Sequence, residues 1–329
     1  MSDDPLLISE SDAASVMDMP SAIRALEAGL LAEARGAATN MTKTHVEFEA
    51  QGGHATLHAI GAAFPDAGIV GTKTWAHTPG GASPLLILYD ANTGRLNAII
   101  EAFALGQLRT GAASGVATKW LAAEEADELA LIGTGKQSIA QVAAVAAVRP
   151  LKRIRVFGRD ADRRGRTAAR IREELGIDVD EAASVSDAVT DAPIVTTVTR
   201  AREPFLTAAM VTRGAHVNAV GAITPGGAEV GRDLVARSRV VVDSPPQARR
   251  LSRELIDYYG HDENAWKAVR PLSAVVAARQ PRTAADDITL FKSLGMGISD
   301  LSLGIEIYNA ARTNGSGTPL PPIPKLVSW

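Results

Sequence analysis

The spacing of apolar residues divides the chain into two patterns. Residues 12–36 place apolar side chains on one helical face, which predicts an amphipathic helix. Residues 41–60 alternate between apolar and polar side chains, as strands do when one face packs on a core. Further strands are expected at 69–75, 85–89 and 96–100, with a hairpin turn at 92–94. The N-terminal part is therefore expected to be mostly β-structure with one helix.

After an alanine- and glycine-rich helix at 104–124, short apolar runs alternate with helical patterns. This alternation is typical of a parallel sheet with right-handed crossovers, and so of an α/β fold. The expected strands lie at 129–132, 153–157, 178–179, 194–198, 216–220, 239–242 and 288–291. The expected helices lie at 137–148, 161–175, 185–190, 245–260 and 297–312. The proline-rich tail at 315–329 is expected to be extended.

One turn in the second pattern contains candidate residues for binding a dinucleotide. The strand at 129–132 runs into the stretch GTGKQS, residues 133–138, and a helix follows. In the dinucleotide fingerprint the first glycine (Gly133) makes the turn and the second (Gly135) lets the backbone approach a pyrophosphate. The third position takes a small residue, here Ser138. A plain turn before a helix would fit the same letters, but the position in the first βαβ unit favours a Rossmann site with pyrophosphate at the helix N-terminus.

The end of the next strand indicates which dinucleotide would bind. NAD sites place a carboxylate there to bind the ribose 2′-OH, whereas NADP sites place an arginine there. Here Phe157 is followed by Gly158 and Arg159, and Asp160 comes one residue later. Arginine offers planar, charge-assisted hydrogen bonds to phosphate, so Arg159 favours NADP(H), with NAD(H) also possible. The arginines that follow it suit a solvated helix face.

The composition excludes several other classes of protein. The chain has 329 residues, a net charge of -3 and no cysteine, so neither disulfides nor thiolate catalysis is available. The slight acidity argues against a nucleic-acid partner. No apolar run is long enough for a membrane span, and the acidic N-terminus lacks the pattern of a secretory signal. A cytoplasmic enzyme without a metal is therefore expected.

Several stretches, taken together and in order, resemble the ornithine cyclodeaminase/μ-crystallin family. They are VGTKTW (70–75), LILYDANTGRLNAII (86–100), LRTGAAS (108–114), LALIGTGKQS (129–138), VTTVTR (195–200), GAHVNAVGA (214–222), VVVD (240–243) and ITLFKSLGMGISDL (288–301). The resemblance implies a Rossmann domain at 123–304. It also implies a mixed α+β substrate-binding and dimerisation domain, formed by residues 1–122 and 305–329. A homodimer and reversible hydride chemistry at C2 of an amino or imino acid are implied as well.

The resemblance also implies roles for individual residues. Lys73 and Arg109 match the family's lysine and arginine that bind the substrate carboxylate, and they are the expected catalytic residues. A carboxylate is well matched by one bidentate guanidinium and one ammonium. Lys43 falls roughly where the family has a third basic residue, usually an arginine, although a solvated strand lysine is the alternative. Lys292 stands where an aspartate is common.

The expected cofactor residues come from three sources. The glycine turn supplies Gly133, Thr134, Gly135, Lys136, Gln137 and Ser138, and the second strand supplies Arg159. The resemblance adds Thr110, Thr197, Val198, Thr199, Asn218, Val220, Ser293 and Gly295.

The most informative departure from the family is Ile223. The cyclodeaminases carry an aspartate there that manages protons during ring closure and ammonia loss, and Thr224 cannot replace a carboxylate base. The sequence therefore favours an NADP(H)-dependent imine reductase, working in reverse as an amino-acid dehydrogenase. A substrate with a second carboxylate would suit Lys43 and the nearby histidines. Among these, His58 and His77 are the candidates for substrate binding or proton transfer, although histidines are more often structural.

Two alternative functions stay open. One is an ornithine or lysine cyclodeaminase that uses bound NAD and a displaced proton-transfer group. The other is a non-catalytic NADPH-binding protein of the crystallin type. The second is disfavoured because two buried cations, Lys73 and Arg109, would be costly without an anionic ligand.

Overall fold

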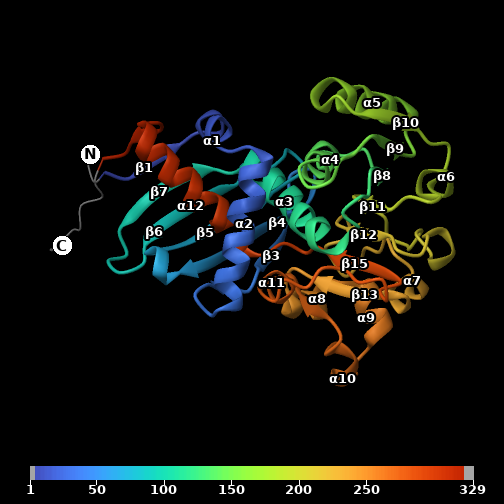
Figure 1. The fold of residues 1–329 in the computed structure, drawn as a ribbon. Helices are drawn as coiled ribbons and strands as arrows, with labels where there is room; N and C mark the ends of the chain where they lie inside the picture. The colour runs from blue at the N-terminus through green and yellow to red at the C-terminus, as the bar shows by residue number, and fades with distance from the viewer. Residues whose placement is uncertain (1–3, 322–329) are drawn as a thin grey trace. The chain divides into compact units, whose positions relative to one another are not determined.

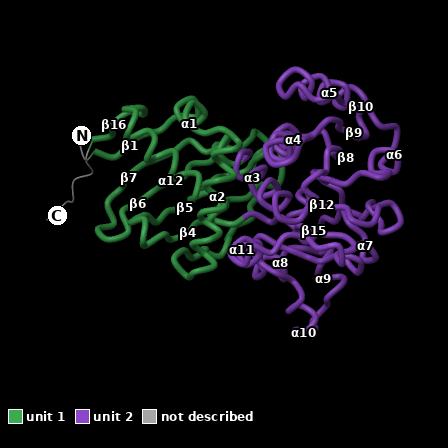
Figure 2. The backbone as a smooth tube through the Cα atoms, viewed as in Figure 1, with its two compact units in different colours: residues 1–106, 296–329 green, residues 107–295 purple. Residues whose placement is uncertain are grey.

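The computed structural model describes residues 4–321, so part of the predicted extended tail at 315–329 lies outside the described residues. The chain forms two compact units (Figure 2): residues 1–106 with 296–329, and residues 107–295. The domain boundaries expected from the sequence, 122/123 and 304/305, lie further along the chain than the boundaries of these compact units. The expected boundaries concern functional domains and stay a prediction. Helix α3 (Phe103–Leu121) begins in the first unit and continues into the second.

The first unit is built on a mixed sheet with the order β16-β1-β7-β6-β5-β4-β2, in which β3 also pairs with β4. Its strands are β1 (Leu6–Ile8), β2 (Thr39–Asn40), β3 (Thr44–Ala50), β4 (Gly53–Phe64), β5 (Ile69–His77), β6 (Leu85–Asp90), β7 (Leu96–Glu101) and β16 (Thr318–Pro319). Each strand expected from the sequence is present. The helix expected at 12–36 is instead two helices, α1 (Glu10–Val16) and α2 (Met19–Ala34). The break arises because the Asp18 carboxylate accepts the Ser21 N–H at 2.8 Å and starts a new helix.

Helices cover one face of this sheet. Helix α12 (Gly297–Asn314) packs on β4, β5 and β6, and α2 packs on α12 (Figure 1). Gly304 lies directly against Leu86, which is fully buried on the covered face. Alternate residues point to the opposite face. Five large apolar side chains there stay exposed: Leu7, Val46, Phe48, Leu57 and Leu85.

The second unit is the expected parallel α/β sheet, with the order β10-β9-β8-β11-β12-β15-β13-β14. Its strands are β8 (Glu128–Ile132), β9 (Arg153–Phe157), β10 (Asp178–Glu181), β11 (Ile194–Thr197), β12 (His216–Ala219), β13 (Ser238–Val242), β14 (Arg270–Pro271) and β15 (Ile288–Lys292). The run from β10 to β12 has the 3-2-1-4-5 order of the doubly wound dinucleotide fold. In that order the crevice for a ligand lies at the carboxyl ends of the strands, where β8 and β11 meet.

The helices of this unit are α4 (Ser138–Ala146), α5 (Ala161–Leu175), α6 (Val185–Val189), α7 (Arg232–Ala236), α8 (Pro245–Leu251), α9 (Arg253–Tyr259), α10 (Glu263–Trp266) and α11 (Leu272–Ala277). The helix expected at 245–260 is divided into α8 and α9, because Ser252 leaves helical geometry and its side chain accepts the Leu255 N–H. Across residues 4–321, none of the helices is long and apolar enough to cross a membrane.

Candidate functional site

The turn after β8 has the shape that the fingerprint requires. Gly133 has a φ of +122°, and a Cβ there would come within 2.6 Å of the Val198 carbonyl oxygen in the loop after β11. A Cβ at Gly135 would meet nothing within 4 Å, so its backbone borders open space. The buried Ser138 starts α4, and its hydroxyl donates to the Gly135 carbonyl at 2.7 Å. These residues fit a pyrophosphate at a helix N-terminus, with Lys136 exposed beside them.

The end of β9 lies beside this turn. A Cβ at Gly158 would meet the Thr134 side chain at 2.7 Å, so the two segments are in close contact. Arg159 follows and is exposed. Asp160 caps α5, since its carboxylate accepts the Arg163 N–H at 3.0 Å. This capping role leaves Arg159 as the group at the tip of the strand.

The loops after β11 and β12 are joined by a buried carboxylate. Glu229 accepts hydrogen bonds from the Thr199 N–H (2.6 Å) and hydroxyl (2.8 Å) on one oxygen. Its other oxygen accepts from the N–H groups of Gly221 (2.7 Å) and Ala222 (3.2 Å). Sequence reasoning did not identify Glu229, although a glutamate between Ala228 and Val230 is a signal of burial with partners. Ile223, which follows Ala222 in the loop after β12, is 41% exposed.

The side chain of Asn218 lies inside the sheet rather than at its rim. It is fully buried, its amide donates to Thr118 Oγ1 at 3.0 Å, and its oxygen is 3.0 Å from His216 Nε2. Burial lowers the pKa of His216 to about 3, so this imidazole is neutral. Thr197 is also fully buried, whereas Val198 and Thr199 are partly exposed.

Arg109 lies against the loop after β15. A Cβ at Gly295, whose φ is +87°, would approach the Arg109 guanidinium to 2.9 Å. Asp243, at the end of β13, holds this loop by accepting from the N–H groups of Leu294 and Gly295, each at 2.7 Å, and from the Ser293 hydroxyl at 3.1 Å. Burial raises the pKa of Asp243, while these hydrogen bonds and the charge of Arg109 oppose that rise. The structure thus brings together Arg109, Ser293 and Gly295, three of the expected site residues. Thr110 follows Arg109 on α3 and is partly exposed.

In the first unit Lys73 is buried and forms an ion pair with Asp300 of α12. The expectation that a buried Lys73 would need a ligand anion is therefore wrong, because the protein supplies one. Sequence reasoning missed Asp300, although an acid within the apolar helix stretch GISDLSLG signals a buried partner. The ammonium of Lys73 also lies 5.3 Å from the centre of the Trp75 ring, within cation–π range.

His58 stacks on the Trp75 ring. Its ring centre lies 4.7 Å from that of Trp75 and 5.6 Å from that of His45. Burial, followed by the charges of Lys43, His45 and His77, lowers the pKa of His58 to about 4. The three predicted residues Lys43, His58 and His77 therefore share one cluster with Lys73. Within residues 4–321, no group of three or more His, Asp or Glu side chains could hold a metal ion.

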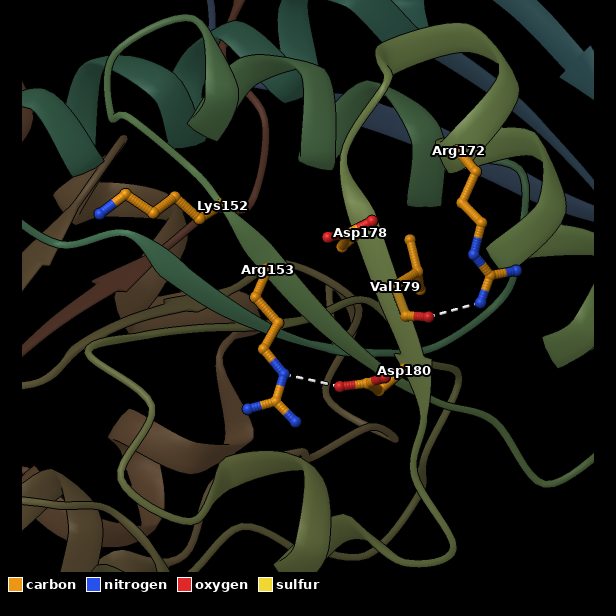
Figure 3. A pocket seen from close by; sticks show the side chains of 6 residues that line it. All are labelled: Lys152, Arg153, Arg172, Asp178, Val179 and Asp180. Carbon is orange, nitrogen blue, oxygen red and sulfur yellow. Dashed lines mark hydrogen bonds and ion pairs between the residues drawn. The ribbon is translucent and has the colours of Figure 1, made fainter.

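A cavity of about 270 Å³ lies elsewhere, at the amino ends of β9 and β10 (Figure 3). Arg153 in its wall is bound to Asp180 at 2.6 Å, and Arg172 donates to the Val179 carbonyl. Because it lies at the amino ends of the strands, at the opposite edge of the sheet, it does not belong to the candidate site.

The fold and the glycine turn define a protein of the dinucleotide-binding α/β class. The chain belongs to the ornithine cyclodeaminase/mu-crystallin family, whose model matches residues 4–315. This confirms the family and the fold class expected from the sequence.

Two curated relatives are reductases of imines. The chain is 31% identical over 238 residues to the delta(1)-pyrroline-2-carboxylate reductase of Bacillus cereus, covering 71% of this chain and 72% of the relative. It is 30% identical over 332 residues to the iminosuccinate reductase of Paracoccus denitrificans, covering 94% and 98%.

Two solved structures match nearly the whole chain. One is the Thermococcus litoralis delta(1)-pyrroline-2-carboxylate reductase in complex with NADH and L-proline (TM-score 0.88, 28% identity, 96% of this chain and 100% of that one). The other is an archaeal alanine dehydrogenase dimer with bound NAD (TM-score 0.88, 26% identity, 97% and 99%).

Proposed function

We propose that this chain is an NAD(P)-dependent oxidoreductase that reduces the C=N bond of a small imino acid and, in reverse, oxidises the amino acid. The proposal is supported by the reductases among its relatives. The observation that carries it is the loop after β12. Its exposed Ile223 cannot transfer a proton, and its carboxylate, Glu229, already accepts from four donors. A cyclodeaminase needs a carboxylate here, whereas an imine with a protonated nitrogen does not.

In this proposal the dinucleotide supplies or accepts a hydride, and the protein binds and orients the imino acid. The Gly133–Ser138 turn would hold the pyrophosphate. Arg109 would bind the substrate carboxylate through two parallel hydrogen bonds, and Lys73 would add a second positive charge to the substrate-binding set. Fixing the carboxylate places C2 in one orientation, which is the main contribution that such residues make to rate.

NADP(H) is the proposed cofactor, with NAD(H) as the possible substitute. The support is the exposed Arg159 at the tip of β9, together with the commitment of Asp160 to capping α5. A guanidinium at this point suits a 2′-phosphate, whereas NAD sites place an acid there. We expect Arg159→Ala to lower kcat/KM for NADPH about tenfold and to change kcat/KM for NADH little.

A homodimer is also proposed. The support is the exposed apolar face of the first sheet, which carries Leu7, Val46, Phe48, Leu57 and Leu85, and the dimeric alanine dehydrogenase among the solved neighbours. Patches of this kind commonly mark protein–protein interfaces.

The decisive experiment is NADPH oxidation by the purified protein with a panel of imines. The panel contains pyrroline-2-carboxylate, piperideine-2-carboxylate, and pyruvate, glyoxylate or oxaloacetate with ammonia or methylamine. We expect turnover with one imine and a loss of about a hundredfold or more in kcat/KM in Arg109→Ala. A preference for the oxaloacetate imine, weakened in Lys43→Ala, would assign the second carboxylate to the Lys43–His58–His77 cluster.

Two other outcomes would replace the proposal. Ammonia release from ornithine or lysine without net cofactor change would identify a cyclodeaminase with a displaced proton-transfer group. Dinucleotide binding without any turnover would identify a non-catalytic binding protein.

A further inference from the structure

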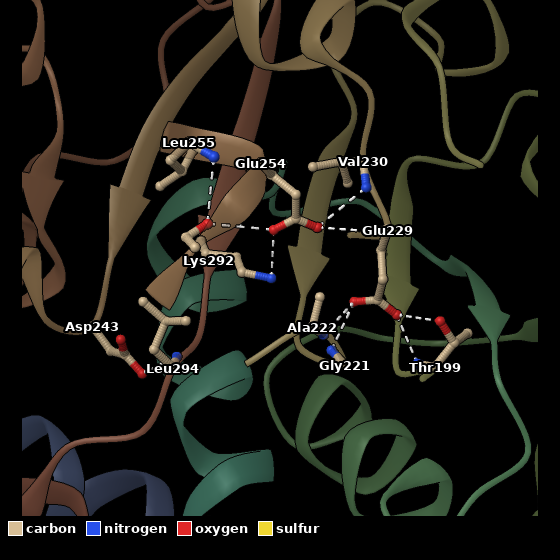
Figure 4. Close-up of polar contacts among 11 residues, drawn as sticks. Thr199, Gly221, Ala222, Glu229, Val230, Asp243, Glu254, Leu255, Lys292 and Leu294 are labelled. Atoms are coloured by element: carbon tan, nitrogen blue, oxygen red, sulfur yellow. Dashed lines mark hydrogen bonds and ion pairs between the residues drawn. The ribbon is translucent and has the colours of Figure 1, made fainter. Parts of the chain in front are cut away.

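Three buried charges link the end of β15 to the loops of the candidate dinucleotide site (Figure 4). Lys292 is the last residue of β15, and its Nζ lies 2.7 Å from Glu254 Oε2. Both side chains are fully buried. The other oxygen of Glu254 accepts the N–H groups of Glu229 (2.7 Å) and Val230 (3.2 Å). Lys292 therefore neutralises the carboxylate that holds the backbone of Glu229 in place.

The side chain of Glu229 then fixes two loops at once. Its four donors come from Thr199, after β11, and from Gly221 and Ala222, after β12. These loops follow neighbouring parallel strands at their carboxyl ends, which is where such sheets bind ligands. The chain's own residues at this edge are thus positioned by one carboxylate.

The contacts continue as far as the glycine turn. A Cβ at Gly221 would overlap the backbone N and O of Thr199, so the two loops touch through their main chains. Thr199 follows Val198, whose carbonyl oxygen packs against Gly133. A displacement at Glu229 would therefore be passed by direct contact to the first glycine of the fingerprint.

We propose that Glu229 is the positioning residue of the dinucleotide site and that Lys292 acts on that site through Glu254. The inference rests on the proposed function only in placing a dinucleotide at the carboxyl ends of the strands. It gives Lys292, whose role the sequence left open, a task that involves no contact with substrate or cofactor.

The chemistry of the site requires a carboxylate at position 229. Both oxygens accept two hydrogen bonds, and an ionised carboxylate has acceptor sites only. A glutamine would place its NH₂ group either against the N–H and hydroxyl of Thr199 or against the N–H groups of Gly221 and Ala222. At least one of the four hydrogen bonds would be lost although the shape is kept, because a hydroxyl can turn to accept but an N–H group cannot. Those that remain would be weaker, since hydrogen bonds to a charged group are the strong ones.

The first test uses Glu229→Gln without any turnover. Amide hydrogen exchange of the protein without nucleotide should be at least about fivefold faster at Thr199, Gly221 and Ala222, and the Kd for NADPH or NADH, followed by nucleotide fluorescence, should rise about tenfold. The matched control is Asp287→Asn. Asp287 pairs with Arg237 at 2.8 and 3.0 Å where β13 and β15 begin, at the opposite edge of the sheet. It should lower stability while leaving the Kd and the exchange of the three amides unchanged.

The second test separates action through Glu254 from direct action by Lys292. Lys292→Met leaves Glu254 buried without its cation and should raise the nucleotide Kd as Glu229→Gln does. The double variant Lys292→Met/Glu254→Gln removes both charges, and the glutamine oxygen still accepts from Glu229 and Val230. It should return the Kd to within about threefold of the wild-type value.

The outcomes distinguish this inference from the proposed function. An unchanged Kd and unchanged amide exchange in Glu229→Gln would overturn the inference even if imine reduction is found. No recovery in the double variant would overturn the role of Glu254 and make Lys292 a direct contact. Wild-type protein that binds a dinucleotide but reduces no imine would refute the proposed function. The comparison of nucleotide Kd and amide exchange between the wild type and Glu229→Gln would still test the inference. Wild-type protein that binds neither NADPH nor NADH would overturn both.

Discussion

The backbone conformation of Gly295 determines where Arg109, the proposed carboxylate-binding residue, can lie. Its φ of +87° is unfavourable for any side chain, and the Arg109 guanidinium occupies the space that a Cβ would need. Asp243 holds the same turn through the N–H groups of Leu294 and Gly295. The position of Arg109 therefore depends on the absence of a side chain at 295.

We expect Gly295→Ala to raise the KM for the imino acid about tenfold, because it displaces Arg109, and to lower the free energy of unfolding by about 1–2 kcal/mol. The measurement is steady-state kinetics beside denaturant unfolding. Gly176→Ala is the matched control, since Gly176 has a φ of +66° and open space around it. That variant should lose stability without a change in KM. Equal KM values in both variants would contradict the role given to the turn.

At the scale of elements, His216 connects β12 to β15. Its two hydrogen-bond partners, Thr289 and Asn218, each bond in turn to α3. Its Nδ1 lies 3.0 Å from the Thr289 hydroxyl, which donates to the Leu121 carbonyl at 2.7 Å. Its Nε2 lies 3.0 Å from Asn218, which donates to Thr118. Because His216 is fully buried, bulk solvent cannot hydrate its ring as an imidazolium.

This network predicts a loss of stability in acid. Burial lowers the pKa of His216 from 6.5 to about 3, so below pH 6.5 the unfolded chain binds a proton that the folded chain does not. The contribution is complete above pH 6.5 and falls by about 1.4 kcal/mol per pH unit as the pH drops toward 3.

Urea unfolding at pH 7 and pH 5 measures this effect. The wild-type protein should lose about 2 kcal/mol more than His216→Gln over that interval. Both should keep a shared loss from His58, whose pKa is also lowered, to about 4. An exposed histidine replaced in the same way, His261→Gln, serves as the control. Parallel losses in the wild type and in His216→Gln would rule out the buried neutral imidazole.

The elements that the sequence predicts well are those that depend on local pattern. Strands β8, β9, β11 and β12 follow from their apolar residues, and the turn at 133–138 follows from its glycines. Errors arise where a single cap restarts a helix, as at Asp18 and Ser252, because apolar spacing continues across the break. The short elements α7, α10, α11 and β14 were missed because so few residues carry no periodic signal.

The missed site residues have a different cause. Asp300, Glu229 and Glu254 each bind a partner that is far away in the sequence, such as Lys73 or Thr199. Their carboxylates look like ordinary surface acids unless the burial of the segment is known. Predicting them requires the tertiary fold, since only the packed sheet brings the donors to one carboxylate.

At the scale of the whole molecule, the exposed apolar face of the first sheet leads to an expected oligomeric state. Val46 and Leu57 are opposed across β3 and β4 and are 62% and 49% exposed. Burying two such side chains contributes several kcal/mol, about 1.5–3 kcal/mol each for complete burial. A second copy of this chain offers the same face, which is the requirement for a symmetric dimer.

We therefore expect the wild-type protein to have the mass of two chains by light scattering, and Val46→Glu/Leu57→Glu to have the mass of one. The charges would be buried without partners in the dimer but solvated in the separate chain, so association loses more than the apolar contribution alone. The strands should persist, because both side chains lie on the face away from α12 and Leu86. Gln51→Glu adds a nearby charge in the β3–β4 turn and should leave the dimer intact. If the double variant keeps the mass of the wild type, this face is not the subunit interface.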